Sequence, residues 1–238
     1  MKLNFFNLRK KIGTWHKPLV VKNLYFSLLL HYYRIFKGRR TFIFRMKKYL
    51  YFYHYYNLTM LCERCVEIPI IWEIVKQHQG KTILEVGNVL SHYFPIKHEV
   101  VDKYETAAGV INTDVVVFKP KEKYNLIVSI STLEHIGWDE TPRDPQKVLI
   151  AIKKLKSFLA PGGQIVVTIP LGYNPYFDQI IYGDGFGFCS KYFFQRQSSD
   201  NVWQEVTLNN LEGVKYGSPF PGANGLFIGF YNKAGKNK

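Results

Sequence analysis

Short apolar segments, bounded by glycine, proline or acidic residues, recur along the last two thirds of the chain. They lie at residues 81–87, 98–102, 110–111, 124–130, 164–169 and 225–231. Between the fourth and fifth segments, apolar residues recur at helical spacing up to the turn at Pro161, namely Val148, Leu149, Ile152, Leu155 and Leu159. Short buried strands that alternate with a helix need crossover connections, which join parallel strands. The pattern predicts an α/β domain built on a mostly parallel sheet.

Two further stretches of this domain have a less regular pattern. Residues 63–77 are apolar at intervals and predict a helix that starts after Pro69, because proline is favoured in the first helical turn. Residues 171–220 are rich in aromatic and turn residues and predict at most one more strand, within residues 192–206. We expect this region to cover a substrate site as a lid.

The charge distribution divides the chain. Residues 1–62 hold 13 Lys and Arg and no Asp or Glu, whereas residues 63–238 hold 19 basic and 18 acidic residues. The formal net charge of +14 therefore lies almost entirely in the first quarter of the chain. We expect a basic, aromatic, helical extension over residues 1–62 and one domain over residues 63–238. Because the domain is near neutral, nucleic acid is not the expected partner.

Aromatic and apolar side chains recur at helical spacing in the extension, at Phe42, Met46, Tyr49, Leu50 and Tyr53. They predict a helix there. Residues 19–36 are more apolar, but Lys22 and Arg34 oppose a membrane span, since a central Lys or Arg costs about 2.5–3.5 kcal/mol. Three interpretations remain open: helices on an anionic membrane surface, helices packed on the domain, and contact with nucleic acid or a protein.

The cysteines indicate a reducing compartment. Cys62, Cys65 and Cys189 are too few for a disulfide framework, and Cys62 and Cys65 lack the second pair that a zinc site needs. We expect free thiols and no bound metal. Residues 1–17 are charged and lack the features of a secretory signal. The expected location is cytoplasmic. A further hypothesis is peripheral contact with the inner face of the membrane.

Polar residues stand where the predicted strands end. They are Glu85 and Gly87 after the first strand, Asp102 after the second, and Ser131, Glu134 and His135 after the fourth. In open parallel sheets, ligands bind at the carboxyl ends of the strands, near the point where the strand order reverses. Each of these residues also has a purely structural interpretation, as a turn or capping residue. No further ligands stand at a spacing that would make Glu134 and His135 a metal site.

Several motifs occur in one order in this part of the chain. They are residues 83–87 (ILEVG), Asp102, Asp114, residues 124–137 (YNLIVSISTLEHIG) and residues 159–163 (LAPGG). Together they resemble class I S-adenosylmethionine-dependent methyltransferases. Residues 87–105 are also similar to a poorly characterised, methyltransferase-like family of unknown function.

The resemblance implies a Rossmann-like class I methyltransferase fold with a mostly parallel, seven-stranded sheet. It implies S-adenosyl-L-methionine as the cofactor, with Asp102 on the ribose hydroxyls and Asp114 near the adenine. Glu85, Gly87 and Ser131 then lie around the donor.

The glycine loop departs from that family. The usual Gly-x-Gly-x-Gly is reduced to Gly87, and only ten residues, interrupted by Pro95, separate Gly87 from His98, too few for a full helix. Asn88 can adopt a left-handed conformation and so complete the turn. Two alternatives follow: the donor site is rebuilt with Asn88 and Ser91, or donor binding has been lost.

The candidate catalytic residues are His135, as a general base, and Tyr173, at the acceptor site. We expect a methyltransferase that acts on a small molecule or a glycan, near a membrane surface. A non-catalytic, methyltransferase-like scaffold is the second hypothesis, and an RNA-modifying enzyme is the third. A nicotinamide dehydrogenase is excluded, because the Gly-x-Gly-x-x-Gly loop that it needs is absent.

Overall fold

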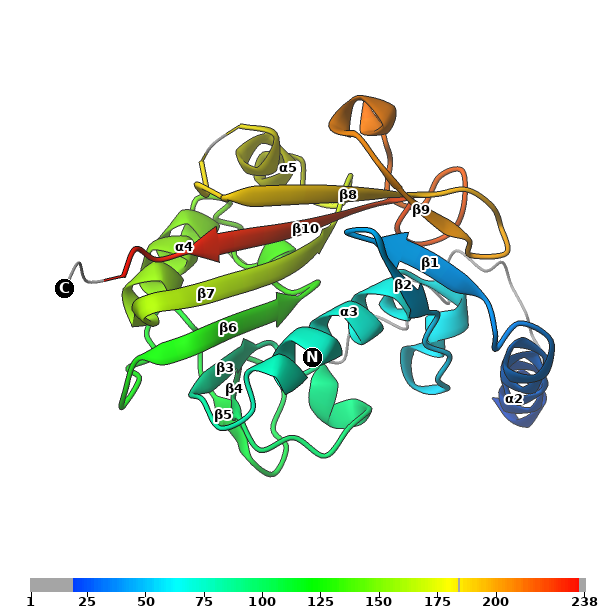
Figure 1. Ribbon diagram of the computed structural model, residues 1–238, viewed down its shortest axis with the longest axis horizontal. Helices are drawn as coiled ribbons and strands as arrows, with labels where there is room; N and C mark the ends of the chain where they lie inside the picture. Colours follow the sequence, from blue (N-terminus) through cyan, green and yellow to red (C-terminus); the bar gives the residue numbers. More distant parts are fainter. Residues whose placement is uncertain (1–18, 184, 236–238) are drawn as a thin grey trace.

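One central sheet, with helices on both faces, dominates the structure (Figure 1). The structure, a computed structural model, describes residues 19–183 and 185–235. The sheet has eight strands in the order β5-β4-β3-β6-β7-β10-β8-β9. The strands are β3 (Ile83–Val86), β4 (Glu99–Asp102), β5 (Val110–Asn112), β6 (Tyr124–Ile130), β7 (Leu159–Pro170), β8 (Ser190–Arg196), β9 (Trp203–Val206) and β10 (Gly225–Asn232).

The first five strands in this order, β5-β4-β3-β6-β7, are parallel to one another. Strand β10 is antiparallel to both β7 and β8, and β9 is antiparallel to β8. The predicted Rossmann-like, mostly parallel α/β fold is therefore confirmed. The sheet has one strand more than the seven expected.

The parallel strands are buried on both faces, which is why their sequences are continuously apolar. In β6, Leu126 packs in the layer that contains helix α3 (Arg64–Gln77). Its neighbour Ile127 packs in the opposite layer, which contains α4 (Lys147–Phe158) and α5 (Pro175–Tyr182). The sheet is thus the middle of three layers, and the ends of its strands remain for a site.

Helix α3 begins before the predicted point, with Pro69 in its interior. Proline has no N–H and so leaves the carbonyl four residues earlier without its helical partner. That carbonyl, on Cys65, instead accepts the backbone N–H of Phe52 at 3.0 Å. The expectation that α3 starts after Pro69 was wrong, because a segment of the N-terminal extension replaces the missing hydrogen bond.

Residues 41–50 form a β-hairpin, so the helix expected over residues 42–53 was also wrong. Strands β1 (Thr41–Phe44) and β2 (Lys47–Leu50) pair antiparallel, and Arg45 and Met46 form the connection. Both connecting residues have positive φ, 51° and 61°, as a two-residue hairpin turn of the primed type requires.

Burial in the hairpin has a period of two, not of 3.6. Phe42 and Phe44 are 3% and 2% exposed, whereas Ile43 between them is 58% exposed. The rings of Phe42 and Phe44 lie 6.0 and 5.9 Å from the ring of Phe194 on β8. The hairpin therefore belongs to the same core as the sheet, and this packing outweighs the local helical spacing.

Helix α2 (Leu19–Phe36) lies within the expected extension, while residues 1–18 lie outside the described residues. Leu30 and Tyr33 are buried on its inner face. The hydroxyl of Tyr33 donates to Asp200 at 2.9 Å, and Arg40 forms an ion pair with Asp200 at 2.6 Å. Within the described residues, no helix is long and apolar enough to cross a membrane.

Part of the region expected to be a lid belongs to the sheet. It contains two strands, β8 and β9, where at most one was predicted. Helix α5 precedes them, and a 3₁₀ turn, η4 (Leu208–Leu211), follows them. The loop after η4 carries Tyr216, whose ring lies 5.1 Å from that of Tyr173.

The hairpin gives a direct test of the shared core. Phe44→Ala should lower the free energy of unfolding by about 3–5 kcal/mol, the usual cost of removing a buried phenylalanine ring. Ile43→Ala, one residue earlier and facing solvent, should change it by less than about 0.5 kcal/mol. Urea denaturation of both variants measures these values. Equal small effects would show that the hairpin does not share the core.

Candidate functional site

The carboxylate of Glu85 organises the turn after β3. Glu85 is fully buried, and its Oε1 accepts the backbone N–H groups of Val89 and Leu90 at 2.9 and 2.8 Å. Its Oε2 lies 2.8 Å from Nε2 of His98. Both oxygens are thus engaged within the protein. Glu85 shapes the site and does not line the cavity beside it.

Gly87 adopts the left-handed conformation in this turn, with φ of +87°. Its N–H donates to the carbonyl of Val101 at 2.8 Å, which brings the turn against β4. A Cβ on Gly87 would lie 2.2 Å from Oγ1 of Thr132, at the end of β6. Only glycine fits here, on grounds of both φ and space. The left-handed residue is therefore Gly87 and not Asn88.

Side chains take the place of the missing glycines. The N–H of Asn88 donates to Oδ2 of Asp102 at 3.0 Å, and its Nδ2 donates to Oε1 of Glu105 at 2.8 Å. Ser91, in the short 3₁₀ turn η2 (Leu90–His92), donates to Oδ1 of Asn88 at 2.5 Å. The expected absence of a full helix here is confirmed. Asn88 and Ser91 brace the turn and do not line the cavity.

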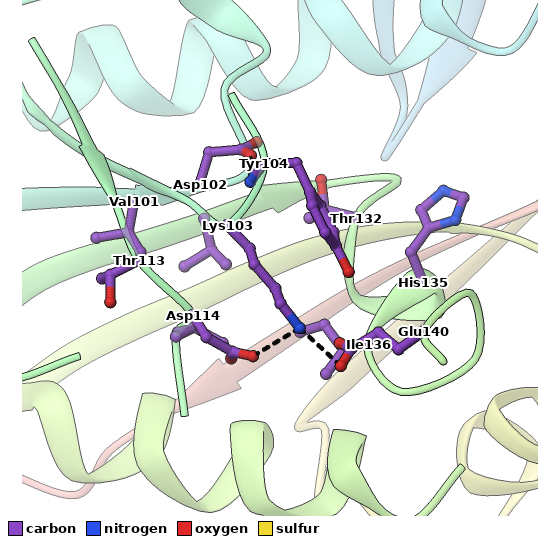
Figure 2. A pocket seen from close by; sticks show the side chains of 13 residues that line it. Val101, Asp102, Lys103, Tyr104, Thr113, Asp114, Thr132, His135, Ile136 and Glu140 are labelled. Carbon is purple, nitrogen blue, oxygen red and sulfur yellow. Dashed lines mark hydrogen bonds and ion pairs between the residues drawn. The ribbon is translucent and has the colours of Figure 1, made fainter. Parts of the chain in front are cut away.

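A cavity opens where β3, β4, β5 and β6 end (Figure 2). It is lined by Val86, Gly87, Val101, Asp102, Lys103, Tyr104, Thr113, Asp114, Val115, Thr132, His135, Ile136 and Glu140. Four of the residues predicted for the site thus come together: Gly87, Asp102, Asp114 and His135. They lie at the switch point of the sheet, where β3 has β4 on one side and β6, which follows β5 in the chain, on the other.

Asp102 is 6% exposed at the wall of this cavity. Its Oδ1 accepts the backbone N–H groups of Tyr104 and Glu105, each at 2.8 Å. With the bond from Asn88, the carboxylate fixes the backbone on both sides of the cavity entrance. Asp102 therefore combines a structural task with the position of a ligand-binding acid.

Lys103 crosses the cavity and closes it. Figure 2 shows its side chain reaching to Asp114 and Glu140, at 3.1 and 2.7 Å. Lys147, at the start of α4, contacts the same two carboxylates at 2.6 and 2.5 Å. Burial alone would raise the pKa of Asp114, but the hydrogen bonds from Lys147 and Lys103 hold it below the ordinary value. Two cations and two anions form one balanced group.

The space that this arrangement leaves is small. The cavity volume is about 50 Å³, room for a few water molecules. A ligand of nucleoside size therefore requires side chains that line the cavity to move.

His135 and Tyr173 meet at a shared carboxylate. His135 ends the 3₁₀ turn η3 (Leu133–His135), and its Nδ1 lies 2.5 Å from Oδ2 of Asp139. The hydroxyl of Tyr173 donates to the same oxygen at 2.6 Å, and the two rings are 4.8 Å apart. Burial would lower the pKa of His135, but Glu134 and Asp139 outweigh it and raise that pKa. This is the arrangement of an oriented base.

A second polar group lies behind η3. Ser131 donates to Oε1 of Glu67 at 2.5 Å, and Arg64 donates to the carbonyl of Ile130 at 3.0 Å. Ser131, expected beside the donor, thus faces α3 and not the cavity. Glu134 is 1% exposed, and burial raises its pKa to about 8 against the opposing effect of His135.

Within the described part of the chain, no group of His, Cys, Asp and Glu side chains could hold a metal ion. Cys62, Cys65 and Cys189 are free thiols, as expected. Burial raises the pKa of the Cys65 thiol well above its usual value, which makes that thiol unreactive.

The sequence did not reveal Lys103, Thr132, Asp139 or Glu140 as site residues. Lys103 directly follows Asp102, and its position after a strand end was the one available signal. Asp139 and Glu140 follow Gly137 in a loop whose path depends on long-range contacts. The N–H of Asp144 returns to the carbonyl of Gly137 at 2.8 Å, which folds that loop over the cavity.

No protein-family model matches the chain, and no curated protein matches it. Its fold is similar to several solved structures. The N-methyltransferase NodS from Bradyrhizobium japonicum WM9, in complex with S-adenosyl-L-homocysteine, is 13% identical, with a TM-score of 0.42 over 68% of this chain and 84% of that chain. A SAM-dependent methyltransferase from Archaeoglobus fulgidus is 14% identical, with a TM-score of 0.43 over 69% and 91%.

A third structure, an S-adenosylmethionine-dependent methyltransferase from Clostridium acetobutylicum, is 12% identical, with a TM-score of 0.38 over 89% of this chain and 99% of that chain. All three are methyltransferases. At these values no residue role passes to this chain, and its function is inferred from its own site.

The buried Glu134 predicts an unusual dependence of stability on pH. Its pKa of about 8 in the folded state lies above the ordinary value of 4.5, so folding takes up a proton. This stabilisation is complete below pH 4.5 and is lost as the pH rises through 8. Between about pH 5 and pH 9, linkage to this pKa is worth about 4 kcal/mol, so the wild type should lose about 8–16 °C more in melting temperature than Glu134→Gln, at about 2–4 °C per kcal/mol. Parallel melting curves for the two proteins would contradict the assignment.

Proposed function

We propose that this chain is an S-adenosylmethionine-dependent methyltransferase whose donor lies in the cavity at Gly87, Asp102 and Asp114. The observation that carries the proposal is the meeting of a glycine turn and an acid at the ends of adjacent parallel strands, β3 and β4, at the switch point of the sheet. Open α/β sheets bind nucleotide-like ligands at this place. The fold is the one that the sequence motifs imply.

Each cavity residue has a task toward the donor. Asp102 accepts the ribose hydroxyls, because a charged acceptor makes stronger hydrogen bonds than a neutral one. Asp114 lies toward the adenine, and Gly87 lets the backbone approach the ligand closely. Glu85, Asn88 and Ser91 hold the turn from behind. The donor displaces Lys103, which then loses two ion pairs.

Methyl transfer is an in-line displacement that needs, above all, correct positioning of the two reactants. His135 lines the cavity beside the position of the methyl group, and Asp139 and Tyr173 fix its ring. For a hydroxyl acceptor on a small molecule or glycan, neutral His135 takes the proton as the methyl group arrives. Because its pKa is raised, activity should increase as the pH rises through that value.

The membrane surface is the proposed place of action. Helix α2 exposes a second apolar face, formed by Leu24, Tyr25, Leu28, Tyr32, Ile35 and Phe36, each 46–74% exposed. At about 100° per residue these positions share one face of the helix. Figure 1 places α2 on the side of the molecule toward which β6 and β7 point. The extension has 13 cations and no acids, which suits anionic lipid.

The closed cavity and the reduced glycine loop favour one alternative, a non-catalytic methyltransferase-like module. In that case Lys103 permanently fills the donor position. An RNA-modifying enzyme has less support, because residues 63–238 are near neutral and the excess cations lie in the extension.

Donor binding tests the proposed site. The wild type should bind S-adenosylmethionine in calorimetry, and Asp102→Ala should weaken binding about 10- to 100-fold, the value of a hydrogen bond to a charged group. His135→Ala should leave donor affinity unchanged, and so should Glu122→Ala at the opposite end of β6. Melting curves confirm that each variant is folded. A wild type that binds no donor at about millimolar concentration would support the non-catalytic module.

The exposed face of α2 predicts vesicle binding. The full chain should float with vesicles that contain phosphatidylserine, and less so at high salt, since charges are screened beyond about 10 Å at 0.1 M. Leu28→Glu with Ile35→Glu should abolish flotation, whereas Ile150→Glu, on the exposed side of α4, should not. Deletion of the extension is no substitute, because the hairpin belongs to the core. Equal flotation of all three proteins, or none at low salt, would refute membrane contact.

A further inference from the structure

Three carboxylates share one buried region between α3 and the turn η3. Glu63 and Glu67 belong to the start of α3, and Glu134 belongs to η3. They are 9%, 0% and 1% exposed. Arg64 lies among them, 3.3 Å from Oε2 of Glu67. We refer to Glu63, Glu67 and Glu134 as the acid cluster.

Oxygens of the acid cluster lack hydrogen-bond partners among the described residues. Both carboxylate oxygens of Glu134 are buried without one, and so are Oε2 of Glu63 and Oε2 of Glu67. The nearest charged contact of Glu134 is Nε2 of His135, at 3.5 Å. Such groups are rare in folded proteins, because a buried carboxylate without a donor costs several kcal/mol.

The protein's own cation offsets this deficit only at Oε2 of Glu67, its ion-pair partner. Arg64 is committed to the carbonyl of Ile130, at 3.0 Å, and to Glu67. Ser131 serves Oε1 of Glu67 and no other carboxylate. The acid cluster therefore has more acceptor capacity than the surrounding side chains use.

The surroundings of the acid cluster are aromatic. The hydroxyl of Tyr93 is also buried without a hydrogen-bond partner among the described residues, and burial raises the pKa of Tyr93 against the opposing charge of Arg64. The charges of Glu63 and Glu134 both act on Tyr216, whose ring contacts Tyr173. Aromatic faces beside carboxylates attract organic cations. Excess acceptors and aromatic rings together point to one kind of ligand, a group with several N–H donors and a positive charge.

We propose that the acid cluster is the acceptor subsite and binds the ammonium group of an amine-bearing small molecule. The inference rests on the proposed function in one respect, namely that this small molecule is the methyl acceptor. His135 lines the donor cavity, and its Nε2 lies 3.5 Å from Oε1 of Glu134, so this one side chain connects the acid cluster with the proposed donor site. Recognition and transfer are thus divided between the two neighbouring residues.

Binding of an ammonium group should change the protonation of Glu134. The groups that act on Glu134 are His135, Glu67 and Arg64, and burial raises the pKa of Glu134 to about 8. Glu134 is therefore mostly neutral at pH 7 while the subsite is empty. A bound cation favours the charged carboxylate. Binding should release a proton into the buffer, and amine affinity should fall as the pH falls below 8.

Two glucosides that differ in one group test the proposal. The full chain is titrated by calorimetry with 2-aminoethyl β-D-glucoside and with 2-hydroxyethyl β-D-glucoside, each in two buffers of different ionisation enthalpy. The amine should bind about 10-fold more tightly or better, as a charge-assisted hydrogen bond allows. It should release a proton, whereas the hydroxyl compound should not.

Two carboxylate variants control this experiment. Glu134→Gln should remove both the preference for the amine and the release of a proton, while Glu122→Gln, exposed at the opposite end of β6, should keep both. Glu134→Gln should fold, because an amide replaces a carboxyl group that is neutral at pH 7. Equal affinities in the wild type, a preference that survives in Glu134→Gln, or no binding of either glucoside would overturn the proposal.

A parallel titration with S-adenosylmethionine separates this inference from the proposed function. A chain that binds the donor without preferring the amine refutes the subsite alone. If the amine binds more tightly, if this preference is lost in Glu134→Gln, and if S-adenosylmethionine does not bind, methyl transfer is refuted and an amine-binding site remains.

Discussion

Two buried carboxylates, Glu85 and Asp102, hold the turn on which the whole site depends. Glu85 accepts two backbone N–H groups of the turn after β3, and Asp102 accepts the N–H of Asn88 from the neighbouring strand. A loop with several glycines would make this turn through backbone freedom. Here hydrogen bonds to the carboxyl groups of Glu85 and Asp102 hold the backbone in the turn, and only Gly87 must remain glycine. The shape of the turn therefore depends on two buried carboxyl groups.

The charged residues at this edge fall into groups with separate tasks. Lys103 and Lys147 balance Asp114 and Glu140, which closes the cavity and ties the loop after β6 to the ends of β4 and β5. Asp139 orients His135 from that same loop. Displacement of Lys103 would therefore affect Asp139, which orients His135, since Glu140 directly follows Asp139.

The sequence predicted the elements whose burial is complete and local. Both ends of the strand from Tyr124 to Ile130 were predicted correctly, because a fully buried parallel strand is continuously apolar. The hairpin was not predicted, because Phe42 and Phe44 are placed by contacts with Phe194 on β8 and Phe230 on β10, which lie far away in the sequence. The site showed the same division. Strand-end position identified Gly87, Asp102 and His135, whereas the role of Lys103 depends on Asp114 and Glu140, which come from two separate segments.

A crystal structure with S-adenosyl-L-homocysteine tests the central claim most directly. The account predicts ribose hydroxyls within hydrogen-bond distance of Asp102, the adenine toward Asp114, and Lys103 withdrawn from Asp114 and Glu140. The sulfur should lie on the side of the cavity that His135 lines. Crystals soaked to saturation that keep Lys103 in place with an empty cavity, or that bind the ligand elsewhere, would contradict it.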